Sequence, residues 1–485
     1  MMNLRTLLEP WVTSRVDCEI VSLEHDSRHM KPGALFLAYP GSLADGRLFI
    51  PQAVSAGASA ILYEPSNWPR DAILTHNIPC IPVPNLALIR GLIASRFYDY
   101  PTRAFSVTGV TGTNGKTTIA YQLAEAHGLL GHRAAYMGTL GQGHVDALQS
   151  SNNTTPDPLS LQRFFYEAKQ DGVEALCMEV SSHALHQARV AGVDFTQAIY
   201  TNLSHEHLDY HETMQAYADA KAMLFAMPTL QYAIINHDDA YAPLMETSVP
   251  ATCKILTYGL DSACDIHAEH AVMSMAGNVF DVDTPWGWFH VQTKTIGRFN
   301  VYNSLAVLGS LLAEGYDPLA VVSVMATLRA SPGRMEIVST KPSVIVDYAH
   351  TPDALENALS TVAELKPREL IVVFGCGGDR DKTKRPMMGE VASRYADKII
   401  LTSDNPRTED PMRIIQEIAE GIPSRSNVVI NADREGAIHH ALNMAEAGDL
   451  ILIAGKGHED YQQIGLKRNP FSDQSVVRLF YQDRM

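Results

Sequence analysis

The sequence predicts an α/β protein of three domains, and two observations carry that prediction. Short apolar runs alternate with segments of helical character along most of the 485 residues, which is the rhythm of parallel strands joined by crossover helices. The composition is 46% hydrophobic, so a chain of this length can build two or three packed cores.

The first and smallest domain is expected over residues 1–100, as an α/β unit. Its apolar segments at 34–38, 60–63 and 78–83 are short and are separated by polar turns and helical patterns. We place the boundary near residues 98–102.

The central domain is expected over residues 101–331. A β-rich run from Phe105 enters a loop of glycines and threonines, and a helical segment follows at 117–128. Further strand-like runs follow at 175–180, 197–201 and 232–236. Strands that alternate with helices in this way predict a mostly parallel, doubly wound sheet.

The last domain is expected over residues 332–485, after a boundary near 330–333. The same alternation returns there, with strand-like runs at 344–347, 370–374, 398–402, 427–430 and 449–454. It predicts a second, Rossmann-like α/β domain.

Charge and termini exclude several classes of protein. A formal net charge of -16 disfavours nonspecific binding to nucleic acid or to anionic lipid, since both need an excess of Lys and Arg. Residues 1–14 carry one basic residue and Pro10 interrupts them, which is unlike a signal peptide. No apolar run approaches the roughly 20 residues that cross a membrane, and the six scattered cysteines suit a reducing cytosol. We expect a cytoplasmic protein without nucleic-acid or membrane partners.

The most specific motif joins a strand to a helix through glycines, over residues 107–118. Glycines let backbone N–H groups approach phosphates, Lys116 can reach the outer phosphates, and Thr117 can bind Mg²⁺. Strict Walker spacing requires glycine where this chain has Val110, so the loop is a P-loop variant. The predicted ATP-binding residues of the loop are Gly112, Thr113, Asn114, Gly115, Lys116, Thr117 and Thr118.

This loop resembles the nucleotide loop of the Mur ligase family, which builds peptidoglycan precursors and is related to folylpolyglutamate synthetases. Further motifs that resemble the family's signatures follow in order at 153–156, 179–183, 202–211, 217–221, 297–303, 333–336 and 347–350. The resemblance spans all three expected domains. It implies a central P-loop-type ATPase domain between a domain that binds a UDP-sugar and one that binds an amino acid.

The resemblance also implies a Mg²⁺ site. By itself, Glu179 at a strand end is a surface carboxylate as often as a ligand, and His207 is more often a structural histidine than a ligand. A lysine such as Lys221 in a helical run is by default a solvated surface residue. In the family the matching glutamate and histidine lie at the metal, and the matching lysine is carbamylated. An anionic ligand suits a metal among phosphates better than an ammonium does. Lys116, Glu179, His207 and Lys221 are the expected catalytic residues, with Thr117 as a further metal ligand.

Three further residues are expected at the nucleotide. The family counterparts of Asn300 and Asn303 contact ATP, and Arg334 resembles an arginine that touches phosphate. The nearby segment 347–350 could be no more than a strand end.

The last domain carries charged loops directly after its strands, where open α/β sheets bind ligands. Such loops are either solvated turns or a site for a zwitterion, because Arg matches a carboxylate and Asp or Glu matches an ammonium. The segment 404–407 is similar to the signature of family members that add meso-diaminopimelate, whereas lysine-adding relatives lack the arginine. The expected amino-acid site comprises Arg380, Asp404, Asn405, Pro406, Arg407, Gly455 and Glu459.

The UDP-sugar is expected on the first two domains. Residues 26–28 and 44–47 resemble the family's uridine-binding loops. The residues matched to UDP-MurNAc-L-Ala-D-Glu are Ser27, Ser42, Asn153, Thr154, Thr155, Ser181, Gln187 and Arg189.

The resemblance therefore implies a monomeric ATP-dependent ligase that joins meso-diaminopimelate to the D-Glu γ-carboxylate of UDP-MurNAc-L-Ala-D-Glu through an acyl phosphate. Three alternatives stay open at this point. They are a relative that adds L-lysine, a ligase similar to folylpolyglutamate synthetase, and a nucleotide-binding switch or scaffold without ligase activity.

Overall fold

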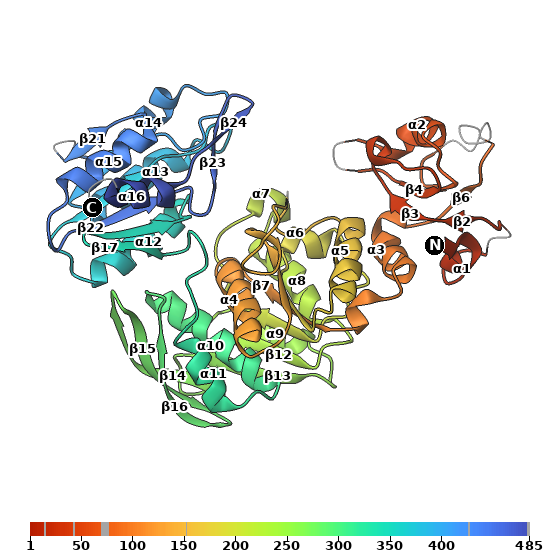
Figure 1. Cartoon of the computed structure of the whole chain (residues 1–485), viewed down its shortest axis with the longest axis horizontal. Helices are drawn as coiled ribbons and strands as arrows, with labels where there is room; N and C mark the ends of the chain where they lie inside the picture. Colours follow the sequence, from red (N-terminus) through yellow and green to blue (C-terminus); the bar gives the residue numbers. More distant parts are fainter. Residues whose placement is uncertain (14–15, 42–43, 69–76, 152, 425–426, 483–485) are drawn as a thin grey trace. The chain divides into compact units, whose positions relative to one another are not determined.

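The computed structural model describes residues 1–13, 16–41, 44–68, 77–151, 153–424 and 427–482. The chain divides into two compact units, Met1–Tyr258 and Gly259–Met485, which are described separately. Figure 1 labels their helices and strands along the sequence. The predicted boundaries near residues 100 and 331 fall inside these units and stay predictions.

The first unit begins with a small four-stranded parallel sheet in the order β3-β4-β5-β6. Its strands are β3 (Ser22–Glu24), β4 (Ala34–Ala38), β5 (Ala60–Tyr63) and β6 (Cys80–Pro82), preceded by β1 (Met2–Asn3) and β2 (Glu19–Ile20). The accompanying helices are α1 (Leu4–Leu8), α2 (Ile50–Ser55) and α3 (Leu86–Phe97). The predictions at 34–38 and 60–63 are confirmed, whereas β6 is shorter than 78–83, because Pro79 precedes it and Pro82 is its last residue.

A larger, mostly parallel sheet follows, with strands in the order β13-β12-β11-β7-β10-β8-β9. Its strands are β7 (Ser106–Thr111), β8 (Ala134–Gly138), β9 (Gly141–Gly143), β10 (Ala175–Glu179), β11 (Gln197–Tyr200), β12 (Tyr232–Asn236) and β13 (Lys254–Gly259). Only β9 runs antiparallel to its neighbour. The helices are α4 (Lys116–Leu129), α5 (Pro158–Gln170), α6 (Ser182–His186), α7 (Leu208–His211), α8 (Met214–Phe225) and α9 (Ala242–Ser248).

One apolar core joins this sheet to helices α5 and α8. Leu176 and Ile235 from the strands pack with Phe165 from α5 and Phe225 from α8, and all four side chains are fully buried. Burial of such side chains is the main force that fixes helices on a sheet, at about 1.5–3 kcal/mol for each one. The core therefore holds the carboxyl ends of β7 and β10, where the phosphate loop and Glu179 lie.

The second unit opens with an antiparallel meander that the sequence analysis did not predict. It comprises β14 (Ile266–Ser274), β15 (Gly277–Thr284) and β16 (Gly287–Thr293), and helices α10 (Arg298–Ala313) and α11 (Pro318–Met325) follow it. Helix α10 lies against β14.

The rest of the second unit is a six-stranded sheet in the order β17-β18-β22-β19-β20-β21, parallel except for β17. The strands are β17 (Glu336–Thr340), β18 (Ser343–Asp347), β19 (Leu370–Phe374), β20 (Lys398–Leu401), β21 (Val428–Ile430) and β22 (Leu450–Ala454), with a separate hairpin of β23 (Tyr461–Ile464) and β24 (Lys467–Pro470). The helices are α12 (Pro352–Glu364), α13 (Lys384–Tyr395), α14 (Pro411–Ala419), α15 (Arg434–Met444) and α16 (Asp473–Gln482).

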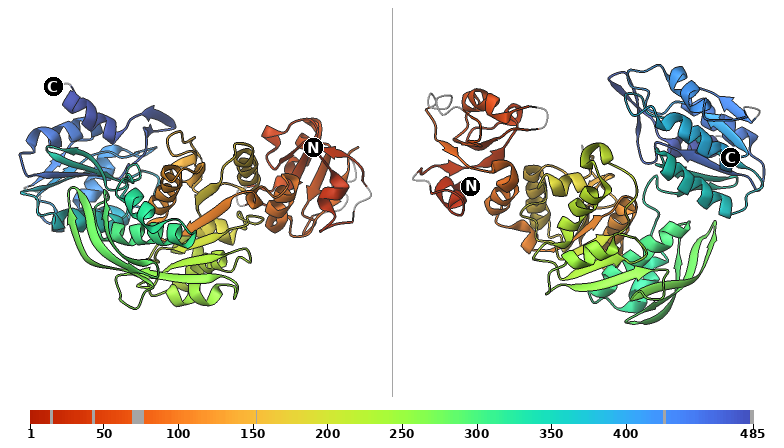
Figure 2. Two further views of the ribbon diagram at one scale, coloured as in Figure 1. Left: turned by 60° about the horizontal axis from the view of Figure 1, so that its bottom comes forward. Right: turned by 180° about the vertical axis from the view of Figure 1, so that it is seen from behind.

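Helices cover both faces of this sheet (Figure 2). Alternate residues of each strand explain the two layers, because Val372 of β19 packs in one apolar core and its neighbours Ile371 and Val373 pack in another. The first core includes α12, α13 and α14, and the second includes α15 and α16. The predicted doubly wound, Rossmann-like domain is confirmed.

Candidate functional site

The phosphate loop connects β7 to α4 as the sequence predicts. Its backbone requires glycine at two positions: Gly112 has a φ of +150°, and a Cβ there would lie 1.7 Å from Thr201 Oγ1. Gly115 has a φ of +88° and precedes the first residue of α4, Lys116. Thr113 N donates to Asn202 O at 2.8 Å, which fixes the loop against the segment after β11.

Two lysine side chains converge on this loop. Lys116 Nζ donates to Gly112 O at 2.9 Å and to Thr113 O at 2.8 Å. Lys221 Nζ, from α8, donates to the same Gly112 carbonyl at 2.7 Å. The sequence predicted both residues for the site, and the structure places their amines at one backbone oxygen.

Lys221 is buried, and no carboxylate of the described residues forms an ion pair with its amine. Its side chain is 1% exposed, and Nζ lies 4.5 Å from the centre of the Tyr217 ring. Burial lowers the Lys221 pKa well below its ordinary value, the Lys116 charge lowers it further, and Glu206 opposes both. Burial and the Lys116 charge therefore both weaken proton binding at this amine.

Glu179, the last residue of β10, accepts hydrogen bonds at both of its carboxylate oxygens. Tyr136 Oη donates to Oε1 at 2.6 Å and Thr139 N donates to it at 2.8 Å. Thr117 Oγ1 donates to Oε2 at 3.0 Å, so the two residues predicted as metal ligands are direct neighbours. Tyr136 and Thr139 were missed by the sequence analysis, because nothing in a strand-end Tyr and Thr marks a partner for Glu179.

His207 lies beside Tyr217, with ring centres 5.9 Å apart, and the Tyr217 hydroxyl lies 3.2 Å from that of Thr113 in the phosphate loop. His207 adopts a left-handed backbone with a φ of +57°. Burial lowers its pKa, and the Lys116 and Lys221 charges lower it as well against the opposing effect of Glu206. A neutral imidazole is the form that can bind a metal.

Four residues predicted for the UDP-sugar form one hydrogen-bonded group beside Glu179. Thr155 Oγ1 donates to Glu179 O at 2.9 Å and accepts from Ser181 N at 3.2 Å. Arg189 Nη1 donates to Thr155 O at 3.1 Å, and its Nε and Nη2 donate to Gln187 Oε1 at 2.9 and 2.7 Å.

The remaining UDP-sugar residues are more dispersed. The Thr154 hydroxyl lies 3.1 Å from the Thr139 hydroxyl, and Asn153 is exposed. Ser27 is buried, and its Oγ donates to Oε1 of Gln52, in helix α2, at 2.8 Å. Ser42 lies outside the described residues.

In the second unit, the residues predicted for the nucleotide make hydrogen bonds or ring contacts with other residues of that unit. Asn303 Nδ2 donates to Asn300 Oδ1 at 2.8 Å, and Asn300 Nδ2 donates to Ile296 O at 2.7 Å at the start of α10. The Arg334 guanidinium lies 4.6 Å from the centre of the Tyr348 ring. Asp347 is buried, accepts from Met335 N and Ala349 N, and has a pKa raised by burial.

The predicted amino-acid residues meet beyond the carboxyl ends of β20 and β22. Asn405 Nδ2 donates to Glu459 Oε2 at 2.8 Å. Lys456, which is fully buried, donates to the same oxygen at 2.8 Å and to Asn405 Oδ1 at 3.2 Å. Lys456 was missed, although it lies inside the charged loop that the sequence analysis singled out.

Glycine at 455 is required beside Asp404. Gly455 has a φ of +113°, and a Cβ there would lie 2.5 Å from Asp404 Oδ2. Asp404 can therefore lie this close to residue 455 because glycine has no side chain.

Arg407 has a fixed and unusual backbone. Its φ is +50°, its N donates to Gln463 O at 3.1 Å, and its O accepts from Gly465 N at 2.7 Å. Its Nη1 donates to Gly378 O at 2.6 Å. Arg380 is exposed, on the loop that contains Gly378. The β23–β24 hairpin, which the sequence analysis missed, thus positions the Arg407 backbone.

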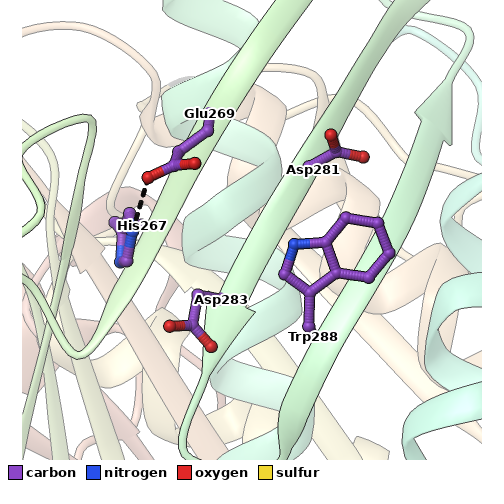
Figure 3. Close-up of a pocket in the computed structure, with 5 residues that line it drawn as sticks. All are labelled: His267, Glu269, Asp281, Asp283 and Trp288. Atoms are coloured by element: carbon purple, nitrogen blue, oxygen red, sulfur yellow. Dashed lines mark hydrogen bonds and ion pairs between the residues drawn. The ribbon is translucent and has the colours of Figure 1, made fainter.

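A separate polar pocket lies on the antiparallel meander, lined by His267, Glu269, Asp281, Asp283 and Trp288 (Figure 3). His267 Nε2 lies 3.2 Å from Glu269 Oε1 within it. None of the residues predicted for the site lines this pocket.

Comparisons with known proteins agree along the whole chain. The profile described as "Mur ligase family, catalytic domain" matches residues 19–98. The "Mur ligase middle domain" matches residues 110–311, and "Mur ligase, glutamate ligase domain" matches residues 333–457.

Two relatives that match almost the full length of the chain are named as ligases of one kind. A UDP-N-acetylmuramoyl-L-alanyl-D-glutamate--2,6-diaminopimelate ligase from Chromobacterium violaceum is 43% identical over 477 residues, covering 97% of this chain and 96% of the relative. The ligase of that name from Geobacillus thermodenitrificans is 42% identical, with 100% of both chains covered.

Solved structures match as well. A structure of a UDP-N-acetylmuramoyl-L-alanyl-D-glutamate--2,6-diaminopimelate ligase has 36% identity and a TM-score of 0.74, covering 100% of this chain and 99% of the other. A MurF ligase from Thermotoga maritima in complex with ADP shares the fold, with 19% identity, a TM-score of 0.61 and coverage of 95% and 97%.

Proposed function

The chain belongs to the Mur ligase family, and we propose that it adds meso-2,6-diaminopimelate to the D-Glu γ-carboxylate of UDP-MurNAc-L-Ala-D-Glu, with ATP as the second substrate. The reaction is an ADP-forming amide synthesis in the assembly of peptidoglycan precursors. Full-length relatives that carry the name of this ligase favour it over the lysine-adding and folylpolyglutamate alternatives.

The observation that carries the amino-acid assignment is the mixed charge of the loops around Asn405. Arg407 offers a guanidinium for a carboxylate, while Asp404 and Glu459 offer carboxylates for an ammonium. Diaminopimelate has a second zwitterionic end, unlike lysine, whose side chain ends in an ammonium alone. A pocket with an arginine at that end suits diaminopimelate, because the distal carboxylate would otherwise be desolvated without a partner.

The residues at the phosphate loop fit Mg²⁺. Among the residues that the structure describes, no group of three or more His, Cys, Asp or Glu side chains could by itself hold a metal. Mg²⁺ keeps several waters and shares substrate phosphates, so it needs few protein ligands. Thr117 and Glu179 present two adjacent oxygens, at 3.0 Å, and His207 has a pKa that favours the neutral ring.

Lys221 would join them after carbamylation, as the family resemblance implies. Its neutral amine attacks CO₂, an N–C bond forms, and one proton leaves to solvent, which gives a carbamate with one negative charge. The 1% exposure and the lowered pKa of Lys221 support this step, because burial disfavours the charged ammonium.

In the reaction, the D-Glu γ-carboxylate attacks the γ-phosphorus of ATP, and ADP leaves from the acyl phosphate. Lys116 balances charge on the phosphates as the loop N–H groups orient them. Bound Mg²⁺ would supply further positive charge to the same oxygens. The diaminopimelate amine then attacks the acyl carbon, loses a proton, and phosphate leaves. Asn405, Arg407 and Glu459 hold this amino acid, so their contribution is mainly orientation.

The wider predictions stay as parts of this proposal. Residues 1–100 with the 153–155 loop bind the UDP-sugar, residues 101–331 bind ATP, and residues 332–485 bind the amino acid. Asn300, Asn303 and Arg334 contribute to the ATP site. We propose a cytoplasmic monomer without nucleic-acid or membrane partners. In the described part of the chain, no helix is both long and apolar enough to span a membrane.

The test is phosphate release from ATP in the presence of UDP-MurNAc-L-Ala-D-Glu, with meso-diaminopimelate, L-lysine or no amino acid. We expect release that depends on meso-diaminopimelate, and Lys116→Ala should abolish it while the fold is retained. Release with lysine alone would overturn the pocket assignment, and no release with any amino acid would overturn the ligase.

A further inference from the structure

Two arginines meet at Gln187 in the first unit. Arg189 donates to Gln187 Oε1 from both Nε and Nη2. Arg90, from helix α3, donates from Nη2 to the Gln187 carbonyl at 3.3 Å. Arg90 is not among the residues expected at the substrate, yet its guanidinium is brought to the same residue as that of Arg189.

Close backbone contact between α3 and the 188–193 turn creates this meeting. A Cβ on Gly91 would lie 2.3 Å from Ala191 O, and a Cβ on Gly192 would lie 2.8 Å from Gly91 O. Gln162 Nε2 of α5 also donates to Gly192 O at 3.0 Å. The two glycines therefore let the helix approach until Arg90 reaches Gln187.

The two positive charges have no matching carboxylate. No acidic side chain among the described residues lies within ion-pair distance of Arg90 or Arg189. Asp157, which acts electrostatically on Arg189, caps α5 by accepting from Leu159 N and Ser160 N. Burial lowers the Arg189 pKa, and the Arg90 charge lowers it further. Such a pair favours an anion between its members.

Arg90 keeps an unused donor for that anion. Its side chain is 9% exposed, Nη2 donates to Gln187 O, and Nη1 makes no hydrogen bond with any described residue, whereas Nε is closed off from solvent. The guanidinium lies 4.9 Å from the centre of the Tyr39 ring, which holds its plane without using its N–H groups. Nη1 therefore remains to donate to that anion.

The position of the pair fits the middle of a nucleotide-sugar. Tyr39 directly follows β4 and leads to the 44–47 loop, and the His25 ring, 6.4 Å from that of Tyr39, precedes the 26–28 loop. Both loops are proposed to bind uridine. On the other side, Arg189 contacts Thr155, whose hydroxyl donates to Glu179 O. The arginines thus lie between the proposed uridine end and the reacting end.

We propose that Arg90 is a further, direct ligand of the nucleotide-sugar's diphosphate, beside Arg189, which is already among the residues proposed for UDP-MurNAc-L-Ala-D-Glu. The inference rests on the proposed function, since that function supplies a UDP-sugar. A diphosphate diester carries two negative charges, which two guanidinium groups neutralise with directed N–H donors.

The experiment compares binding of UDP-MurNAc-L-Ala-D-Glu and of MurNAc-L-Ala-D-Glu, which lacks the UDP, by full-length wild type and Arg90→Gln. For the UDP-sugar we expect Kd to rise on the order of 10- to 100-fold in the variant, as for loss of a charged hydrogen bond. Kd for the UDP-free analogue and for ATP should stay unchanged. Arg90→Lys should recover part of the loss, because it restores charge without the planar fork.

Arg103→Gln is the matched control, because Arg103 is an exposed arginine after α3 that pairs with Asp194 at 3.1 Å. It should bind the UDP-sugar as wild type does. An unchanged Kd in Arg90→Gln, or an equal loss with the UDP-free analogue, would overturn this role of Arg90 while wild-type turnover still supports the ligase. A wild type that fails to bind the UDP-sugar at all would overturn the ligase and the role of Arg90 together.

Discussion

The phosphate loop and the amino-acid pocket each contain a buried lysine, and the two lysines have opposite surroundings. Lys221 is 1% exposed and donates to a backbone carbonyl, and the charge of a second lysine, Lys116, lowers its pKa further. Lys456 is 0% exposed and donates to the Glu459 carboxylate at 2.8 Å. The two lysines are equally buried, but burial lowers the pKa of the Lys221 amine at the phosphate loop, whereas Lys456 in the amino-acid pocket forms an ion pair.

The difference shows how one residue type can do two kinds of chemistry. A buried amine without a counter-charge loses its proton more easily and can react with CO₂. A buried ammonium with a carboxylate partner stays a structural cation, and removal of either partner leaves the other unpaired. We assign Lys221 to the reaction and Lys456 to the positioning of Glu459 and Asn405.

The largest expected effect is on turnover. Lys221→Met should lower kcat on the order of 10²- to 10³-fold, as for loss of an electrostatic group at a reacting phosphate. Lys456→Met should instead raise the KM for diaminopimelate, since it disturbs Glu459 and Asn405. Steady-state kinetics with each substrate varied in turn separates the two. Similar kcat losses with unchanged KM in both variants would remove the distinction.

The next effect concerns the tight backbone of the amino-acid pocket. Gly455→Ala should weaken diaminopimelate binding and destabilise the fold by about 2–3 kcal/mol, because its Cβ would press on Asp404 and its φ is +113°. Gly128→Ala is the control, in helix α4 with nothing within 4 Å of a Cβ. It should be neutral or stabilise by about 0.5–1 kcal/mol. Urea unfolding and amino-acid titration measure both, and equal outcomes at the two glycines would contradict the packing argument.

The two lysines should also differ in stability. Lys456→Met should cost about 2–3 kcal/mol, below the ~3–5 kcal/mol of a fully buried pair, since Glu459 is 17% exposed. Lys221→Met should be neutral or stabilising in CO₂-free buffer, because it removes a desolvated amine. Denaturant unfolding of both variants tests this, and a larger loss for Lys221→Met would reverse the comparison.

The Lys221 effect should depend on pH in CO₂-free buffer. Folding lowers the pKa of Lys221. Between this lowered pKa and the ordinary value of about 10.4, the unfolded chain therefore binds a proton that the folded chain does not. Wild-type stability should rise with pH in that window, by at most about 1.4 kcal/mol per pH unit, relative to Lys221→Met. A stability difference that does not change between about pH 7 and about pH 9 would contradict the lowered pKa of Lys221.

The smallest expected effect is at Glu179. Tyr136→Phe removes one hydrogen bond to its carboxylate, from a donor at 2.6 Å, and should cost about 1–2 kcal/mol in stability or in apparent Mg²⁺ affinity. Thermal unfolding and a Mg²⁺ titration of turnover measure it. Tyr166→Phe, at an exposed tyrosine of α5, is the control and should leave both unchanged.

Much of the fold is predictable from local patterns. The strands at 232–236 and 370–374 agree residue for residue, because their apolar runs are bounded by clear polar turns. The meander β14–β16 was missed, since residues such as His267 and Glu269 make β14 polar and mask the strand pattern. The β23–β24 hairpin was missed for a similar reason.

The candidate site divides in the same way. Gly115, Lys116 and Thr117 can be predicted from the sequence, because consecutive residues define a phosphate loop. The contacts of Lys456 with Asn405 and of Arg90 with Gln187 join residues far apart in the chain, 51 and 97 positions respectively. Only the folded backbone brings such pairs together, so local sequence carries no sign of them.

The most direct test of the account is labelling with isotopically labelled bicarbonate, followed by NMR of the intact protein. We predict a carbamate signal in wild type and in Lys456→Met that is absent in Lys221→Met. A signal retained in Lys221→Met, or absent from wild type under conditions where turnover is full, would contradict the assignment of Lys221 as the carbamylated ligand.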